Sequence, residues 1–173
     1  MDAFVTMRHI SKNTLTNEIF NYKLLEHDKR LSLLESTFNN FKEKNNHIFF
    51  EGQIYDAYSL LLNIFDKSKK CIIVIDNYID KNLLDLLSKT NKSIQVLSSN
   101  MNEELITKYK IQYKNTEIIE TQEFHDRFII IDDCLVYHSG ASFKDLGKRC
   151  FAINLIQDED FIKRLLERIK KLT

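Results

Sequence analysis

The feature that most constrains the fold is an alternation, after residue 52, of short apolar runs with segments whose apolar residues recur at helical spacing. The run Cys71–Ile75 is short and rich in β-branched residues, which is typical of a buried strand. Further strands are predicted at residues 93–97, 117–119, 127–131, 135–138 and 151–156. Helices are predicted at residues 54–65, 83–87, 101–113 and 161–169. Strands that alternate with helices and then follow one another closely predict an α/β domain with a mixed sheet flanked by helices.

A long helix is predicted before this domain, over residues 10–44, where neither Gly nor Pro occurs. In a heptad that starts at Ile10, seven of the ten a and d positions are apolar, as in an imperfect coiled-coil seam. Leu15, Ile19 and Leu33 lie off this seam, so packing on the chain's own domain is the other interpretation. The predicted partition is a long helix within residues 1–46 and a compact domain over residues 47–173.

The charge balance restricts where a phosphate could bind. Lys and Arg together number 25, and Asp and Glu also number 25. This balance excludes a chain that is basic throughout, so any phosphate site must be local. The longest apolar runs, Cys71–Ile75 and Phe128–Ile131, are far shorter than the roughly 20 residues that cross a membrane. No membrane partner is therefore expected.

Three cysteines, Cys71, Cys134 and Cys150, are an odd number and lie far apart, which argues against a disulfide framework and against a zinc site. Cys71 and Cys134 lie in or beside apolar runs, where a free cysteine acts as a small hydrophobe. Free thiols fit a reducing compartment, so the cytoplasm is the predicted location. The histidines of the first 47 residues lack metal-ligand spacing, and neither a metal nor another cofactor is expected.

A candidate site follows from two neighbouring predicted strands. His125 and Arg127 are two residues apart where the first of them begins, so their side chains are expected on one face. The second strand ends in a turn where Gly140 lies between Ser139 and Ser142, and bare amides beside hydroxyls suit an anion. These five residues together predict a phosphate pocket.

The same stretch resembles the phospholipase D superfamily, whose signature is His-x-Lys, four residues and Asp. His125, Arg127 and Asp132 match it at the right spacing, with Arg in place of Lys. After six more residues, residues 139–142 fill the family's Gly-Ser-x-Asn-like turn, with Gly and Ser exchanged and Ser at the Asn position. The resemblance spans about residues 48–172 and implies a phospholipase D-like mixed sheet.

The resemblance also implies metal-independent phosphodiester chemistry. His125 would be the nucleophile that forms a phosphohistidine, or the acid–base partner of that nucleophile. Arg127 would bind the non-bridging oxygens, Asp132 would orient an imidazole, and Ser142 with the backbone of Gly140 would complete the phosphate cradle. Active members bring two such motifs together, and one complete copy is visible here, so a working site implies a homodimer.

A second resemblance lies at the amino-terminal end. Residues 2–10 are similar to the closing helix of phage-type KilA-N-related DNA-binding domains, the ORF-six N-terminal family. This resemblance implies that residues 1–46 are the end of an upstream DNA-binding domain and a dimerising linker, with nucleic acid as a partner. The other interpretation of these residues is the apolar start of a helix.

Two functions stay open. The first is a metal-independent phosphodiesterase or nuclease that acts as a homodimer through a phosphohistidine. The second is a catalytically degenerate regulatory or oligomerisation domain that binds anions or nucleic acid without cleaving it. Arg127 keeps the charge of the family's Lys but is bulkier, and Ser142 lacks the amide of Asn. Whether the chain is an enzyme is therefore undecided at this stage.

Two further groups of residues have both a local and a functional interpretation. Asp76 and Asp80 follow the first predicted strand, where they would form a turn and cap a helix. A cation or substrate contact is the alternative for both. Lys144, Lys148 and Arg149 follow the glycine turn, where they bind a phosphate backbone or form a solvated basic loop.

Overall fold

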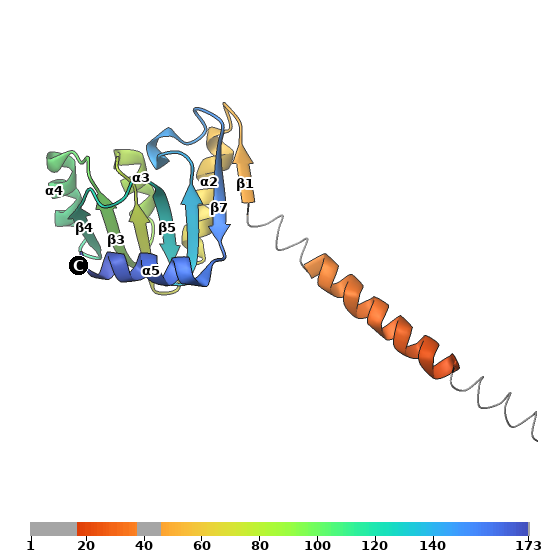
Figure 1. Ribbon diagram of the computed structural model, residues 1–173. Coiled ribbons are helices and arrows are strands. Elements are labelled where there is room, and N and C mark those ends of the chain that lie inside the picture. The colour runs from red at the N-terminus through yellow and green to blue at the C-terminus, as the bar shows by residue number, and fades with distance from the viewer. Residues whose placement is uncertain (1–16, 38–45, 173) are drawn as a thin grey trace, which may run out of the picture. The chain divides into compact units, whose positions relative to one another are not determined.

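The computed structural model describes residues 17–37 and 46–172 (Figure 1). The chain divides into two compact units, residues 1–44 and 45–173. In the first unit, residues 17–37 form one helix, as the heptad pattern predicts. The rest of the helix predicted over residues 10–44 lies outside the described residues, and so does the segment of residues 2–10.

The second unit contains a seven-stranded mixed sheet with the strand order β1-β7-β6-β5-β2-β3-β4. The strands β2, β3 and β4 pair in parallel, and every other neighbouring pair is antiparallel. The predicted α/β class with a mixed sheet is thereby confirmed. The strands are β1 (Asn46–Phe49), β2 (Cys71–Ile75), β3 (Ser93–Ser98), β4 (Thr116–Glu120), β5 (Arg127–Ile131), β6 (Leu135–Ser139) and β7 (Phe151–Ile156).

The edge strand β1 is not predicted by the sequence pattern. Its four residues include Asn46 and the exposed Ile48, and the run is too short and too polar to show a strand periodicity. What holds it is pairing with β7, where Phe49 lies opposite Phe151 and the two rings stack at 5.0 Å. The strand therefore depends on a contact with a residue that lies far away in the sequence.

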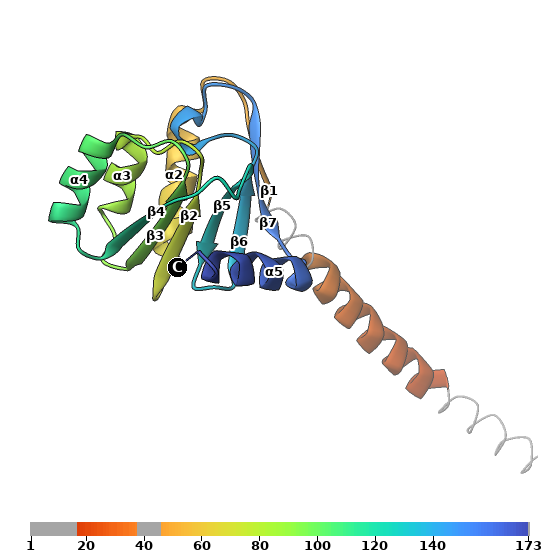
Figure 2. The ribbon, with the colours of Figure 1, turned by 60° about the vertical axis from the view of Figure 1, so that its left-hand side comes forward.

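Helices cover both faces of the sheet (Figures 1 and 2). Ile72 and Val74 of β2 pack in the cluster that includes α2, α3 and α4, whereas Ile73 and Ile75 pack in the cluster that includes α5. Successive residues of a strand point to opposite faces, so a continuous apolar run such as β2 serves both clusters. The helices are α2 (Ile54–Asp66), α3 (Lys81–Leu87), α4 (Glu103–Gln112) and α5 (Glu159–Lys170), with a 3-10 turn η1 (Phe143–Asp145).

Three of these helices begin at a side-chain cap. Asp80, Asn102 and Asp158 each accept a hydrogen bond from the backbone amide three residues on, at 3.0, 3.0 and 2.9 Å. The cap satisfies an amide that has no partner within the helix. The predicted capping role of Asp80 is therefore confirmed. No helix in the described part of the chain is long and apolar enough to cross a bilayer.

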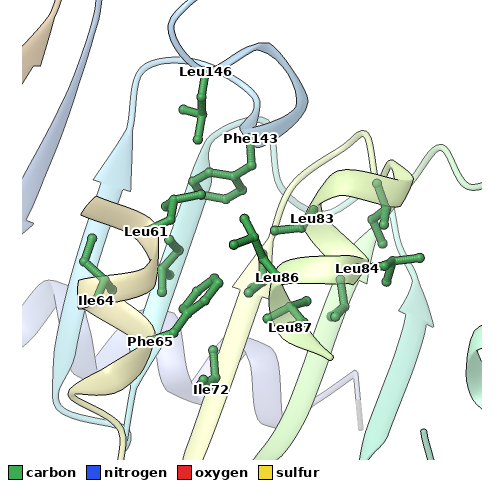
Figure 3. Packing of buried hydrophobic residues seen from close by; sticks show 14 of the residues in the cluster. Leu61, Ile64, Phe65, Ile72, Leu83, Leu84, Leu86, Leu87, Phe143 and Leu146 are labelled. Carbon is green, nitrogen blue, oxygen red and sulfur yellow. The ribbon is translucent and has the colours of Figure 1, made fainter. Parts of the chain in front are cut away.

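The loop after β6 is anchored on the helices α2 and α3. Figure 3 shows Phe143 and Leu146 of this loop beside Leu61 of α2 and Leu83 of α3. Phe143 is 6% exposed and Leu146 is 8% exposed, so both side chains belong to the core. Their burial positions Lys144 and Asp145, which lie between them, and the residues that follow Leu146 in the loop.

Gly147 closes this loop against the start of α2. Its φ of +73° lies in the left-handed region, and its carbonyl accepts a hydrogen bond from the amide of Gly52 at 2.9 Å. A Cβ at position 147 would lie 2.5 Å from the Cα of Ile54. Only glycine therefore fits between the loop and the helix.

We expect Gly147→Ala to lower the free energy of unfolding by about 2 kcal/mol or more. The left-handed backbone costs a residue with a Cβ about 1–2 kcal/mol, and the clash with Ile54 adds to this cost. Gly140→Ala is the matched control, because the nearest atom to a Cβ there lies at 3.7 Å. Its expected effect is within about 0.5 kcal/mol. Urea denaturation measures both, and equal effects of the two substitutions would contradict the prediction.

Candidate functional site

The sheet brings three predicted residues to one of its ends. β2 and β5 are antiparallel, with Ile75 opposite Phe128. Asp76, which follows β2, and Arg127, which begins β5, therefore lie at the same end. β6 pairs with β5 so that Ser139 lies opposite Arg127. The topology thus gathers a carboxylate, a guanidinium and the turn after β6.

The carboxylate of Asp76 joins the turn after β6 to the end of β2. It is fully buried. The Ser142 hydroxyl and the Phe143 amide donate to one of its oxygens at 2.8 and 2.7 Å, and the Tyr78 amide donates to the other at 3.1 Å. Burial raises the pKa of Asp76 above its ordinary value, and these hydrogen bonds and the charge of Arg127 oppose that rise. The predicted turn accounts for the Tyr78 bond, but not for the bonds from Ser142 and Phe143.

A hollow of about 500 Å³ opens beside this turn, and we call it the arginine hollow. Arg127 is half-buried, and its buried Nε has no hydrogen-bond partner among the described residues. Lys148 binds Asp145 at 2.8 Å, and this bond is the main reason that the pKa of Asp145 lies below its ordinary value. Four cations and one carboxylate therefore line the same hollow. The lining residues are Tyr78, Arg127, Ala141, Ser142, Lys144, Asp145, Lys148 and Arg149.

Of the three residues predicted to bind phosphate, Ser139 and Gly140 form hydrogen bonds with the chain's own backbone. The buried Ser139 hydroxyl donates to the carbonyl of Ala141 at 2.8 Å. The Gly140 amide donates to the carbonyl of Ala152 at 3.0 Å, so it is not a bare amide for an anion. Ser142 does line the arginine hollow, with its hydroxyl hydrogen directed to the carboxylate described above. Of Ser139, Gly140 and Ser142, the structure places Ser142 in the arginine hollow, beside Arg127 and the cations of the following loop.

His125 lines a hollow of the described chain that does not include Arg127, and the expectation that the two side chains point to one face stays a prediction. β5 begins at Arg127, and His125 lies in a bend before it, so the alternation of the strand does not extend to His125. His125 is exposed and lines a second hollow of about 580 Å³ beside α5, which we call the histidine hollow. Its lining residues are Glu123, Phe124, His125, Asp126, Phe128, Asp158, Phe161, Arg164, Leu165 and Arg168.

Asp132 lies at the other end of β5 from both hollows. The five residues of that strand separate it from the arginine hollow by about 17 Å at the usual rise per residue. Its carboxylate accepts hydrogen bonds from the amides of Lys69, Lys70 and Cys71 at 2.8, 2.8 and 2.9 Å, and from the Ser68 hydroxyl at 3.2 Å. Asp132 therefore holds the start of β2, and none of these hydrogen bonds among the described residues comes from an imidazole.

These backbone hydrogen bonds, first that of Cys71 and then that of Lys69, hold the pKa of Asp132 far below its ordinary value of 3.8. They favour the charged carboxylate, because an ionised oxygen is the stronger acceptor. The charge thus contributes to the stability of the fold.

Among the described residues, no group of three or more His, Cys, Asp or Glu is placed to hold a metal ion. Cys71, Cys134 and Cys150 are free thiols, and burial is the main cause that raises the pKa of Cys71. Cys71 is half-buried, as a small hydrophobe in a strand should be, whereas Cys134 is exposed and is not a core residue.

Comparisons with known proteins identify the fold. No protein-family model matches the chain, and no curated protein matches it. Among solved structures, NucT from Helicobacter pylori has a TM-score of 0.55 and 13% identity over 73% of this chain and 94% of its own. The archaeal chromatin protein TrmBL2, described as showing a novel mode of DNA binding, has a TM-score of 0.51 and 15% identity. That match covers 99% of this chain and 68% of TrmBL2.

Identities this low show a common fold and nothing further. The chain shares the α/β fold of NucT, which is consistent with the phospholipase D-like mixed sheet that the motif implies. The fold that the motif at His125 implies is confirmed.

We expect Asp132→Asn to lower the melting temperature at pH 7, and the loss should shrink as the pH falls below about 4. A carboxyl with a lowered folded-state pKa stabilises the fold above its unfolded pKa, and this stability is lost as the pH falls toward the folded value. Asp133→Asn, in the same turn but exposed, is the matched control and should change little. Thermal melts from pH 7 to pH 3 measure both, and a constant difference across that range would contradict the prediction.

Proposed function

We propose that this phospholipase D-like domain binds the phosphates of nucleic acid at the arginine hollow. The observation that carries the proposal is the concentration of four cations against one carboxylate in that hollow, in a chain whose net charge is zero. Such a local excess of positive charge attracts a phosphate backbone even when the whole protein is neutral.

Arg127 supplies the most specific contact of this site. Its planar guanidinium presents donors in a fork that suits two phosphate oxygens. The described residues leave its buried Nε without a partner, so a phosphate oxygen would satisfy a group that the fold does not. Lys144, Lys148 and Arg149 extend the positive charge along the loop, as consecutive phosphates require.

The likeness in fold to TrmBL2, which is described as binding DNA, supports nucleic acid as the partner. Contacts to phosphate carry no base information, so we propose binding that is largely independent of sequence. This function corresponds to a regulatory domain that holds nucleic acid without cleaving it.

We expect Arg127→Gln to weaken binding to fluorescein-labelled DNA about tenfold or more, since a hydrogen bond to a charged group contributes about 1.5–3 kcal/mol. The slope of log affinity against log salt concentration should fall by about one. Fluorescence anisotropy measures both quantities.

Arg164→Gln is the matched control, because Arg164 lines the histidine hollow and should leave affinity nearly unchanged. Binding that is lost with Arg164→Gln but kept with Arg127→Gln would contradict the proposed site.

A second candidate function is that of a metal-independent phosphodiesterase, and the exposed position of His125 favours it. The imidazole of His125 would attack phosphorus and form a phosphohistidine while the bond to the leaving oxygen breaks. A second His125, from another copy, would protonate that oxygen, and water would then hydrolyse the phosphohistidine. Active members of the superfamily that the motif resembles bring two such motifs together, and one complete copy is visible here, so we propose that this reaction uses a dimer.

The helix of residues 17–37 offers a surface for such a dimer. Large apolar side chains at its a and d positions are between 51% and 65% exposed, and leaving them in water costs about 25 cal/mol per Å². We propose that two copies pair through this seam as a coiled coil, with Asn17 and His27 favouring one register. The exposed apolar seam residues are Phe20, Leu24, Leu31 and Leu34.

We expect the dimer, if it is an enzyme, to hydrolyse bis-nitrophenyl phosphate in EDTA and to lose this activity with His125→Asn. Leu31→Asp in the seam should reduce both the sedimentation coefficient and the turnover. Leu33→Asp is the matched control, since Leu33 lies off the seam and is 67% exposed. Activity that survives His125→Asn and disappears with EDTA would contradict this candidate. The absence of any turnover would leave phosphate binding as the function.

The wider setting of the chain is also part of the proposal. The resemblance of residues 2–10 supports an upstream DNA-binding domain in a phage-related protein. The free thiols Cys71, Cys134 and Cys150 support a reducing compartment such as the cytoplasm.

A further inference from the structure

An exposed aromatic ring lies at the arginine hollow. Tyr78 lines this hollow and is 43% exposed, although its backbone is held firmly. Its amide donates to Asp76 at 3.1 Å, and it forms an isolated bridge with Asn100, which lies in the loop after β3. The ring is therefore held in place from the backbone, while much of its surface faces solvent.

A cation lies over the same ring. The Nζ of Lys144 is 4.1 Å from the centroid of Tyr78, close enough for a cation–π interaction. Lys144 follows Phe143, and the Phe143 amide donates to the buried carboxylate of Asp76. The same carboxylate accepts the amide of Tyr78. The carboxylate of Asp76 thus holds the backbone of both loops, one of which carries the ring and the other the cation.

We propose that the arginine hollow selects single-stranded nucleic acid, with a base stacked on Tyr78 and the neighbouring phosphates on Arg127 and Lys144. This inference rests on the proposed phosphate-binding function and deepens it. A nucleotide carries an aromatic base and a phosphate within one residue of chain, and the hollow brings an aromatic ring and four cations together. Stacking on an aromatic side chain inside a positive groove is how sequence-independent single-strand binders work.

A duplex does not fit this arrangement equally well. In a duplex the bases are stacked on one another and paired, so no base face is free to contact Tyr78. Lys148 and Arg149 lie in the same hollow beyond Arg127 and Lys144. This number of cations exceeds what the phosphate of one mononucleotide would use, and it favours a strand with several phosphates.

Three DNA probes of equal length test the inference by fluorescence anisotropy: a single strand, a hairpin duplex of the same sequence, and an abasic strand with the same phosphates. The wild type should bind the single strand about 5- to 100-fold more tightly than the abasic strand. Tyr78→Ala should reduce single-strand affinity to the abasic level and leave the duplex and abasic affinities unchanged. Tyr78→Phe should retain the wild-type preference.

Tyr55→Ala is the matched control, because Tyr55 is 79% exposed on α2 and does not line the hollow. It should leave all three affinities unchanged. AMP is then tested as a competitor. If it displaces the strand at concentrations near the strand's own dissociation constant, the ligand is a mononucleotide and the inference of a single strand is wrong.

A second measurement keeps the inference testable if Tyr78→Ala unfolds. The chain has no tryptophan, so Tyr78→Trp introduces a single tryptophan into the protein. Single-stranded DNA should quench its fluorescence by stacking, and the abasic strand at saturation should not. Equal quenching by both strands would overturn the inference.

The two proposals fail in different ways. If Arg127→Gln weakens all three probes while Tyr78→Ala weakens none of them, phosphate binding stands and single-strand selection is wrong. If no probe binds the wild type, or Arg127→Gln leaves every affinity unchanged, the proposed function itself is wrong and this inference falls with it.

Discussion

The buried carboxylate of Asp76 is the interaction on which the candidate site depends. A charged group without solvent is costly unless it is hydrogen-bonded, and three donors from two loops satisfy it. Those loops carry Tyr78 on one side and Lys144 on the other, so the same bonds set the shape of the arginine hollow. The need of the buried Asp76 carboxylate for hydrogen bonds therefore determines how the two loops that line the arginine hollow are placed.

Asp76 and Asp132 perform related tasks at the two ends of one pair of strands. β2 runs between them, and β5 pairs with it in the opposite direction. Asp132 accepts the amides that open β2, and Asp76 accepts one amide from the loop after β2 and one from the loop after β6. Both carboxylates stabilise backbone, and the motif's aspartate is structural here although its spacing suggests a place beside the histidine.

His125 and Arg127 bear on the two candidate functions in different ways. Arg127 begins β5 and lines the arginine hollow, whereas His125 lies in the bend before β5 and lines the histidine hollow. Phosphate binding requires only the arginine hollow, which one chain supplies. The proposed cleavage would use a second copy, and the exposed seam on the helix of residues 17–37 is the surface proposed to bind it.

The sequence by itself predicts the elements that depend on local patterns of residues. The apolar runs at Cys71–Ile75 and Arg127–Ile131 predict strands with the observed bounds, because strands buried on both faces need continuous apolar residues. The cap at Asp80 is similarly visible, since its partner lies three residues away. Even the resemblance to the phospholipase D superfamily depends on spacing within one short stretch.

Only the tertiary structure decided what these residues do. Asp76 bonds to Ser142 across 66 positions, and Asp132 bonds to Cys71 across 61. The strand β1 exists because of β7, and the side on which His125 lies depends on where β5 begins. Periodicity reports the interactions of a residue with its near neighbours. Partners so far apart are chosen by strand order and loop path, and neither of these has a local signature in the sequence.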